Sequence, residues 1–418
     1  MNLIPKAAVV VVRWSLFAML IIANVSHAQT RNDALMAAAT AEQAAVVKTL
    51  ERLVNIETGT GDADGMAAMG QFLETELKAL GATVTRSKAV GNSVGDNIVA
   101  RIPGKGGRKV LMMAHMDTVY AKGTLAKAPF RVDGVRAFGP GIADDKGGMA
   151  VILHTLKLLK DRGFQDYSTI TVLFNTDEER GSTGSRDLIE AVAREHDVVL
   201  SFEPTVALRE MITLATSGIA TVRATIKGKA AHSGANPEAG VNAMVEASDF
   251  ILRTIDLDNK DRAFRFNWTV GTGGKVPNII PDESVIDANI RYAKADDLSA
   301  AMKLLQERAA KPRLAGAQIN VQLIMGRPAF VADAEGRRLV DKAVAIYKEV
   351  GAELVVIPVT GGGTDAAYAA LSGKPVIEGL GLPGFGYHSD QAEYVMIDAI
   401  PRRLYLAARM VMDVAQGK

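Results

Sequence analysis

The chain has 418 residues, of which 48% are hydrophobic and 23% are charged, a composition typical of a globular protein large enough for two domains. Its net charge of +1 gives no electrostatic reason to expect a nucleic-acid partner. Cysteine is absent, which excludes disulfides, thiolate metal ligands and a cysteine nucleophile.

The first 28 residues are typical of a secretory signal peptide. Lys6 precedes an apolar run that Arg13 interrupts and that continues to Val25, and Ser26 and Ala28 are small residues that favour cleavage. An uncleaved membrane anchor is the alternative, because residues 7–25 approach the length that spans a bilayer. We expect a cleaved leader, no stable membrane partner afterwards, and export to the periplasm, an oxidising compartment suited to a chain without thiols.

Hydrophobic periodicity predicts helices and strands that alternate after the leader. Helices are expected at 33–54, 66–80, 149–160 and 184–194, and strands at 82–87, 97–102, 109–114, 170–174 and 197–202. Such alternation favours an α/β fold with a mostly parallel sheet. Sheets of this kind place their functional sites at the carboxyl ends of the strands.

The pattern changes between residues 215 and 325. Strands are expected at 222–228, 264–270, 285–291 and 319–324, and helices at 241–254 and 296–308. This β-α-β-β-α-β order is that of a ferredoxin-like α+β sandwich. Alternation resumes in residues 326–418, with a helix at 335–350, a strand at 353–358 and a final helix at 401–415. We therefore interpret residues 215–325 as a domain inserted between the two parts of the α/β domain, 29–214 and 326–418.

Acidic and histidine side chains follow several of the expected strands. Strand ends supply His115, the pair Glu178 and Glu179, and Glu203, while glycine-rich loops supply Asp144 and His388. Two imidazoles and three carboxylates among them are a hard ligand set that suits zinc or a similar divalent ion. Five ligands are too many for one catalytic zinc with an open position, and they favour two metals that share a carboxylate. The alternative to a metal site is that these acids lie in solvated turns and these histidines only pack in the core. We interpret His154 as such a packing residue and not as a ligand.

The two adjacent acids predict a division of roles. Neighbouring side chains of an extended segment point to opposite sides, so Glu179 could hold a metal while Glu178 moves a proton. Glu178 could deprotonate a metal-activated water and return the proton to a leaving amine, which predicts amide hydrolysis. Asp117, two residues after His115, could fix the imidazole tautomer. An exported binding protein without turnover is the alternative from another class, and the intact Glu178 argues against it.

A glycine run, Gly361-Gly362-Gly363-Thr364, precedes a further expected helix near residue 366. Its backbone N–H groups would suit an anion such as a substrate carboxylate. The run lacks the lysine of a phosphate-binding loop, so it gives little support for nucleotide binding.

Seven motifs together resemble the dinuclear zinc aminoacylase and carboxypeptidase family. They are MAHMDT, GPGIADDKGG, NTDEERGS, SFEP, GKAAHSG, TGGGTDA and GYHSD, and they extend over the chain after the leader. Within that family the chain resembles the bacterial glutamate carboxypeptidases of the carboxypeptidase G type. The resemblance implies a zinc-peptidase catalytic domain, a dimerisation (lid) domain at 215–325, and two Zn2+ per subunit.

The resemblance also implies a role for each matching residue. Asp144 would bridge the metals, with His115 and Glu203 on one zinc and Glu179 and His388 on the other. Glu178 would be the general base and Asp117 the partner of His115, and the Asp144–Asp145 peptide bond would be cis.

Further implications concern the substrate and the partner subunit. His232 would reach into the active site of the other subunit of a homodimer and stabilise the oxyanion. The substrate would be bound by Asn278, Arg291, Arg327, Gly362, Gly363 and Thr364. The implied reaction is the zinc-dependent removal of C-terminal glutamate from small N-acyl glutamates such as folate and its analogues. An aminoacylase or dipeptidase with a different acyl preference is the alternative.

Overall fold

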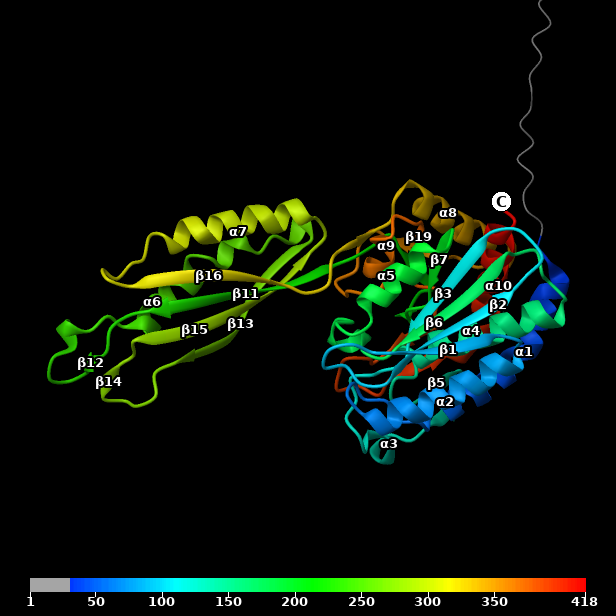
Figure 1. Ribbon diagram of the computed structural model, residues 1–418, viewed down its shortest axis with the longest axis horizontal. Coiled ribbons are helices and arrows are strands. Elements are labelled where there is room, and N and C mark those ends of the chain that lie inside the picture. Colours follow the sequence, from blue (N-terminus) through cyan, green and yellow to red (C-terminus); the bar gives the residue numbers. More distant parts are fainter. Residues whose placement is uncertain (1–30) are drawn as a thin grey trace, which may run out of the picture.

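The structure is a computed structural model that describes residues 31–418, so the expected signal peptide lies outside the described residues. Two lobes lie side by side and are joined by a narrow connection (Figure 1). The chain crosses between the lobes twice, where β10 (Ala215–Thr216) pairs antiparallel with β17 (Phe330–Val331). Among residues 31–418, no helix has both the length and the apolar character that crossing a membrane requires.

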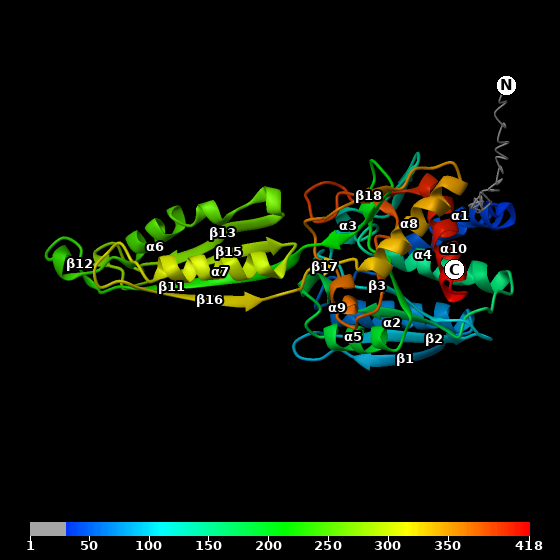
Figure 2. The ribbon, with the colours of Figure 1, turned by 90° about the horizontal axis from the view of Figure 1, so that it is seen from above.

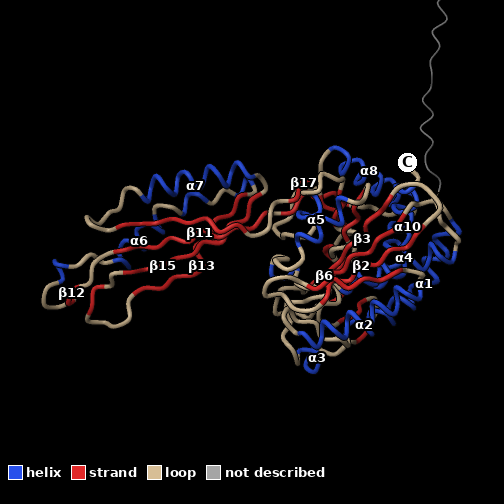
Figure 3. Tube along the Cα trace, viewed as in Figure 1, coloured by secondary structure: helices blue, strands red, loops and turns tan. Residues whose placement is uncertain are grey.

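The larger lobe is built on an eight-stranded sheet with the order β1-β2-β6-β3-β7-β19-β9-β18. Its strands, among them β2, β3 and β6, are red in Figure 3. The strands are β1 (Thr83–Lys88), β2 (Asp96–Pro103), β3 (Lys109–His115), β6 (Thr169–Asn175), β7 (Val198–Ser201), β9 (Met211–Thr213), β18 (Val355–Ile357) and β19 (Val376–Glu378). The four central strands, β6 to β19, run parallel as expected. The sheet as a whole is mixed. β1 and β2 form an antiparallel hairpin, and β2 also pairs antiparallel with β6.

Helices cover both faces of this sheet. One face carries α1 (Asp33–Val54), α2 (Ala63–Ala79), α4 (Lys146–Asp161), α8 (Ala334–Glu349) and α10 (Ile400–Ala415), and the other carries α5 (Arg186–Arg194) and α9 (Ala366–Ala370). Successive side chains of a strand point to opposite faces, and in β3 Val110 and Met112 join the first core whereas Leu111 and Met113 join the second. The α/β fold inferred from the sequence is thus confirmed, with two helical layers around the sheet.

Helix starts are set by acidic caps that the periodicity did not reveal. α2 begins at Ala63, before the expected residue 66, because the Asp62 carboxylate accepts a hydrogen bond from the Gly65 N–H at 3.3 Å. α4 begins at Lys146 and not at residue 149, because Asp145 caps it through the Gly148 N–H at 3.1 Å. Asp144 therefore lies one residue before a helix cap.

A small five-stranded sheet of very short strands lies beside the main one. Its order is β4-β5-β21-β20-β8, formed by β4 (Arg131–Asp133), β5 (Arg136–Phe138), β8 (Thr205–Val206), β20 (Pro383–Phe385) and β21 (Tyr394–Met396). α3 (Thr124–Lys127) precedes it in the chain. The β5–β21 pairing brings the loop that follows β5 next to the loop that precedes β21.

The smaller lobe is an antiparallel sheet with the order β13-β15-β11-β16 and two helices. Its elements are β11 (Gly218–Lys227), α6 (Ala243–Leu252), β13 (Phe264–Gly273), β15 (Glu283–Tyr292), α7 (Ala295–Ala309) and β16 (Gln318–Met325). This is the β-α-β-β-α-β order expected of a ferredoxin-like sandwich. A two-stranded antiparallel sheet of β12 (Ala231–His232) and β14 (Ile279–Ile280) forms the tip farthest from the larger lobe (Figures 1 and 2).

The core of the smaller lobe can be probed on its own. Phe250 of α6 is fully buried, and its ring contacts that of Trp268 with centroids 5.9 Å apart. Trp268 is the single tryptophan outside the expected leader, so its fluorescence reports on this lobe. We predict that Phe250→Ala destabilises the lobe by about 3–5 kcal/mol. Urea unfolding followed by tryptophan fluorescence measures this, with the exposed Lys303→Ala as the control. A loss below about 0.5 kcal/mol, the size of an ordinary surface effect, would contradict the packing.

Candidate active site

The site lies where three adjacent parallel strands end. β3 ends at His115, β6 leads into Glu178 and Glu179, and Glu203 follows β7 after one intervening residue. Because β6, β3 and β7 are neighbours with aligned register, their carboxyl ends meet at one edge of the sheet.

Two sets of side chains could hold a metal ion, and we call them the ligand groups; the first consists of His115, Asp144 and Glu203. His115 Nε2 lies 2.9 Å from Asp144 Oδ1 and 3.9 Å from Glu203 Oε1. The His115 side chain is 1% exposed, and its other nitrogen, Nδ1, is 2.9 Å from the Asp117 carbonyl oxygen. A proton on Nδ1 leaves Nε2 with a free lone pair that points at the two carboxylates.

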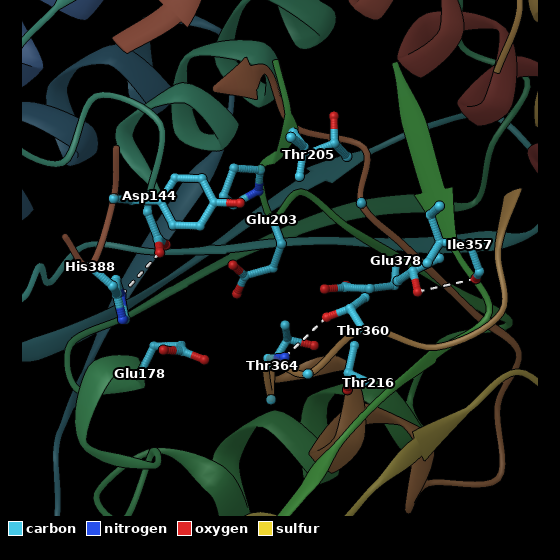
Figure 4. A pocket seen from close by; sticks show the side chains of 18 of the residues that line it. Asp144, Glu178, Glu203, Thr205, Thr216, Ile357, Thr360, Thr364, Glu378 and His388 are labelled. Atoms are coloured by element: carbon cyan, nitrogen blue, oxygen red, sulfur yellow. Dashed lines mark hydrogen bonds and ion pairs between the residues drawn. The ribbon is translucent and has the colours of Figure 1, made fainter. Parts of the chain in front are cut away.

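The second ligand group consists of Asp144, Glu179 and His388, so Asp144 belongs to both groups. His388 Nε2 lies 3.2 Å from Asp144 Oδ2 and 2.9 Å from Glu179 Oε2. His388 has a φ of 53°, in the left-handed region that residues other than glycine adopt infrequently. Its hydrogen bonds with the two carboxylates raise its pKa to about 10. Figure 4 shows Asp144, Glu203 and His388 directed toward a common space.

The residues present fit a pair of metal ions. In each group the donor atoms lie within 4.8 Å of one another. Burial raises the pKa of Glu203 well above its ordinary value and raises that of Glu179 as well, and the charge of Asp144 adds to both shifts although His115 opposes them. Glu179 Oε1 is buried and, among the described residues, has no hydrogen-bond partner. Divalent cations would offset the negative charge of these clustered carboxylates and give Glu179 Oε1 a partner.

Asp117 lies between the ends of two strands. Its carboxylate is fully buried and accepts hydrogen bonds from the Glu178 N–H at 2.9 Å and the Glu179 N–H at 3.2 Å. Thr60 adds a third, from its hydroxyl at 2.6 Å. The same carboxylate lies 3.3 Å from His115 Nδ1. Asp117 thus orients a ligand of each group.

Glu178 and Glu179 contact different partners, as expected. The expectation that they do so because they lie in an extended segment was wrong. Residues Glu178–Arg180 form a 3-10 turn and not an extended segment, because Asp117 binds both N–H groups and so folds the chain around its carboxylate. Glu179 faces His388, whereas Glu178 forms an ion pair with Arg327. Burial raises the pKa of Glu178 to about 8, although Arg327 acts in the opposite direction.

A cavity of about 610 Å³ opens beside the ligand groups. Its walls include Glu178 and the sequence-predicted Arg291, Arg327, Gly362, Gly363 and Thr364. Arg327 is almost fully buried, and it also donates hydrogen bonds to the Glu178 carbonyl at 2.7 Å and the Gly363 carbonyl at 2.6 Å. Burial lowers the pKa of Arg291, and the charge of Arg327 adds to this effect.

Two of the sequence-predicted residues lie outside this cavity. His232 is exposed on β12, and Asn278 is exposed just before β14, both in the far tip of the smaller lobe. Nδ1 of His232 accepts hydrogen bonds from the Gly234 and Ala235 N–H groups, at 3.2 and 3.1 Å. Within one chain, the described structure does not bring either residue to the ligand groups (Figure 2).

Sequence reasoning missed two buried acids at the site. Glu378 lines the cavity at the end of β19, and burial raises its pKa to about 7 (Figure 4). Asp365 accepts hydrogen bonds from Asn175 at 2.6 Å and from Ser182, and it lies 3.5 Å from Arg327. The strand-end rule applied to residues 376–378 would have found Glu378, but three residues are too few to show a strand's periodicity.

Buried nitrogen and oxygen side chains that could hold metal ions at the carboxyl edge of an α/β sheet, with a further buried acid beside them, are typical of a metal-dependent hydrolase. Residues 111–413 match the family described as Peptidase family M20/M25/M40, and the chain belongs to this family. The Asp144–Asp145 peptide bond is cis, as the sequence resemblance implied.

Known proteins resemble the chain in sequence and in fold. It is 64% identical over 397 residues to Carboxypeptidase G2 of Pseudomonas sp. (strain RS-16), covering 95% of this chain and 96% of that protein. Aminopeptidase PepT of Bacillus cereus has a similar fold, with a TM-score of 0.77 and 23% identity over 89% of this chain and 99% of its own. The YXEP protein of Bacillus subtilis, a dinuclear metal-binding peptidase, gives a TM-score of 0.68 and 17% identity over 90% and 99%.

Asp117 offers a direct test of how the site is held together. We predict that Asp117→Ala lowers metal affinity or turnover by about 10–100-fold, because it frees His115 and the Glu178–Glu179 turn together. Metal titration of the apo protein and steady-state kinetics measure the two effects. Asp133→Asn, at a side chain that is 78% exposed in the same lobe, is the control. Affinity and turnover equal to those of the control would refute this role.

Proposed function

We propose that the protein hydrolyses the amide bond to a C-terminal glutamate in N-acyl glutamates such as folate and its analogues. The observation that carries the proposal is Asp144, which belongs to two ligand groups beside a cavity that also holds the buried acid Glu178. The similarity to Carboxypeptidase G2 supports a carboxypeptidase of this kind over an aminoacylase or dipeptidase with another acyl preference.

We assign two Zn2+ ions to each subunit. His115, Asp144 and Glu203 would hold one ion, and Asp144, Glu179 and His388 the other. When bound, such ions polarise a scissile carbonyl and bring the pKa of a water near neutrality. Side chains of the protein transfer the proton and bind the substrate.

Glu178 acts as the general base. Its carboxylate removes a proton from the attacking water as the oxygen bonds to the amide carbon, and it returns that proton to the nitrogen as the C–N bond breaks. Arg327 supports this role, because its contacts with both the side chain and the carbonyl of Glu178 hold the acid in place. The buried Asp365, 3.5 Å from Arg327, helps to hold Arg327 in turn.

Arg291 is the residue in the cavity best suited to bind a substrate carboxylate. It lies on β15, and its Nε donates one long hydrogen bond, 3.3 Å, to Asn289. Burial and the charge of Arg327 both disfavour the charged form of Arg291, and a carboxylate bound to Arg291 would offset this. Gly362, Gly363 and Thr364 form the adjoining wall of this carboxylate site.

A homodimer would complete the site. His232 and Asn278 lie far from the ligand groups of their own chain, as expected if they act in the partner subunit. α6 of the smaller lobe supports such an interface, because its side chains Met244, Val245 and Leu252 are 47%, 45% and 69% exposed. In the partner site, His232 would stabilise the oxyanion and Asn278 would contact the substrate.

We also propose that the protein is exported to the periplasm after cleavage of residues 1–28. The proposal rests on the charge and hydropathy pattern of that segment and on the absence of cysteine.

The substrate assignment is tested by comparing glutamate release from folate with deacylation of N-acetyl amino acids by the purified protein. Glutamate release that exceeds the deacylation of every N-acetyl amino acid is the expected result. A protein that deacylates N-acetyl amino acids but releases no glutamate would be the alternative enzyme.

The base assignment is tested with Glu178→Gln, which keeps the size of the side chain and removes its ability to accept a proton. We predict that turnover falls by about 10²–10⁴-fold while bound zinc is unchanged. Glutamate release and metal analysis measure the two effects, and Glu195→Gln, at a side chain that is 58% exposed, is the control. If Glu178→Gln retains wild-type turnover, Glu178 is not the base.

The contribution across the dimer is tested by mixing two inactive variants. His232→Ala is expected to lose turnover but keep zinc, and Asp144→Ala to lose zinc. Random exchange of subunits gives heterodimers with one complete site, which would restore about a quarter of wild-type activity. A mixture of Asp144→Ala with Glu178→Ala is the control and should stay inactive. If the first mixture stays inactive as well, His232 does not act in the partner subunit.

A further inference from the structure

Glu393 is a buried acid that lies between the two loops carrying Asp144 and His388. Its side chain is almost fully buried, with the residue 4% exposed, and it follows His388 by five positions. It belongs to neither ligand group, and the mechanism above does not use it.

The carboxylate of Glu393 binds the backbone of the Asp144 loop at three points. Oε2 accepts a hydrogen bond from the Gly141 N–H at 2.9 Å. Oε1 accepts two, from the Ala143 N–H at 2.7 Å and from the Asp144 N–H at 3.0 Å. The last of these bonds fixes the backbone of the residue shared by both ligand groups.

The backbone of Glu393 joins the same two loops. Its carbonyl accepts a hydrogen bond from the Gly139 N–H at 3.2 Å, and the next residue, Tyr394, pairs with Phe138 of β5. The His388 loop also turns back tightly here, because a Cβ at Gly386 would lie 2.9 Å from the Glu393 Cα. Glu393 is therefore the point at which the His388 loop is attached to the Asp144 loop.

A carboxylate is the side chain best suited to this position. Three converging N–H donors need acceptors only, and a carboxylate offers two acceptor oxygens and no donor. Glutamine would turn an NH2 group toward one of the N–H groups and lose at least one of the bonds. Burying the negative charge of Glu393 beside the carboxylates of the two ligand groups is unfavourable in itself. The three hydrogen bonds from backbone N–H groups compensate for this cost.

We propose that Glu393 is a positioning residue that sets the metal affinity of the site, and of the second ligand group above all. The reason is that two of the three ligands of the second group, Asp144 and His388, lie on the segments that Glu393 joins. The first group has only Asp144 on these segments. This inference rests on the proposed pair of metals.

The test compares Glu393→Gln with wild type and with Glu349→Gln. Glu349 is a matched control, since its side chain is 4% exposed and accepts hydrogen bonds from Tyr405 at 2.6 Å and Arg409 at 2.5 Å, without contributing to either ligand group. Each protein, loaded with zinc, is dialysed against increasing concentrations of a chelator, and bound metal is measured by mass spectrometry. Circular dichroism follows the fold in the same samples.

We expect wild type and Glu349→Gln to keep two zinc ions over the same range of chelator. Glu393→Gln should lose one zinc at a chelator concentration about 10–100-fold lower, and the other zinc with a smaller change. Saturating zinc should restore its kcat with KM unchanged. Glu393→Asp keeps the charge but is shorter by one methylene, so it should lose zinc at a chelator concentration between those for wild type and Glu393→Gln. It replaces Glu393→Gln in the test if Glu393→Gln does not fold.

The inference would be overturned if both Glu393 variants lost zinc at the same chelator concentration as wild type. This would hold even if the two variants melted at a lower temperature than wild type, as we expect of Glu349→Gln. Equal weakening of the two zinc ions would overturn the preference for the second group. A wild-type protein that binds fewer than two zinc ions would instead refute the metal pair on which the proposed function rests.

Discussion

The shared carboxylate of Asp144 is the interaction on which the rest of the site depends. One of its oxygens faces His115, from the end of a central strand, and the other faces His388, from a loop more than 240 residues later in the chain. Burial opposes its ionisation, yet the two histidines hold the pKa of Asp144 below its usual range. The surrounding structure keeps this one side chain in place: Asp145 caps α4 directly after it, and Glu393 binds the N–H groups on its other side.

Arg327 relates the two lobes to the chemistry. It is the second residue after β16, the last strand of the smaller lobe, and its carbonyl accepts a hydrogen bond from the Ile219 N–H at 2.8 Å. Its side chain turns into the larger lobe and pairs with Glu178, while Arg291 reaches the same cavity from β15. Any rotation of the smaller lobe therefore acts on residues beside the proposed base. Closure of this kind is a common way to complete a hydrolase site around its substrate.

Much of this arrangement was predictable from local patterns, and the rest depends on distant contacts. The central strands were long and apolar enough to identify, so His115, Glu179 and Glu203 could be placed at one edge of a sheet. The order of elements was also enough to predict the ferredoxin-like lobe. Glu378 ends β19 and Glu393 directly precedes β21, and both were missed because strands of three residues carry almost no periodicity. The 3-10 turn at Glu178 was missed because Asp117, 61 positions earlier, imposes it.

The central claim is that two metal ions share Asp144. Diffraction from crystals of the zinc-loaded protein, with anomalous data collected at the zinc absorption edge, tests it most directly. We expect two peaks roughly 3.5–4 Å apart, both within bonding distance of Asp144. One should be flanked by His115 and Glu203 and the other by Glu179 and His388. A single peak, or a second peak away from Asp144, would contradict this account.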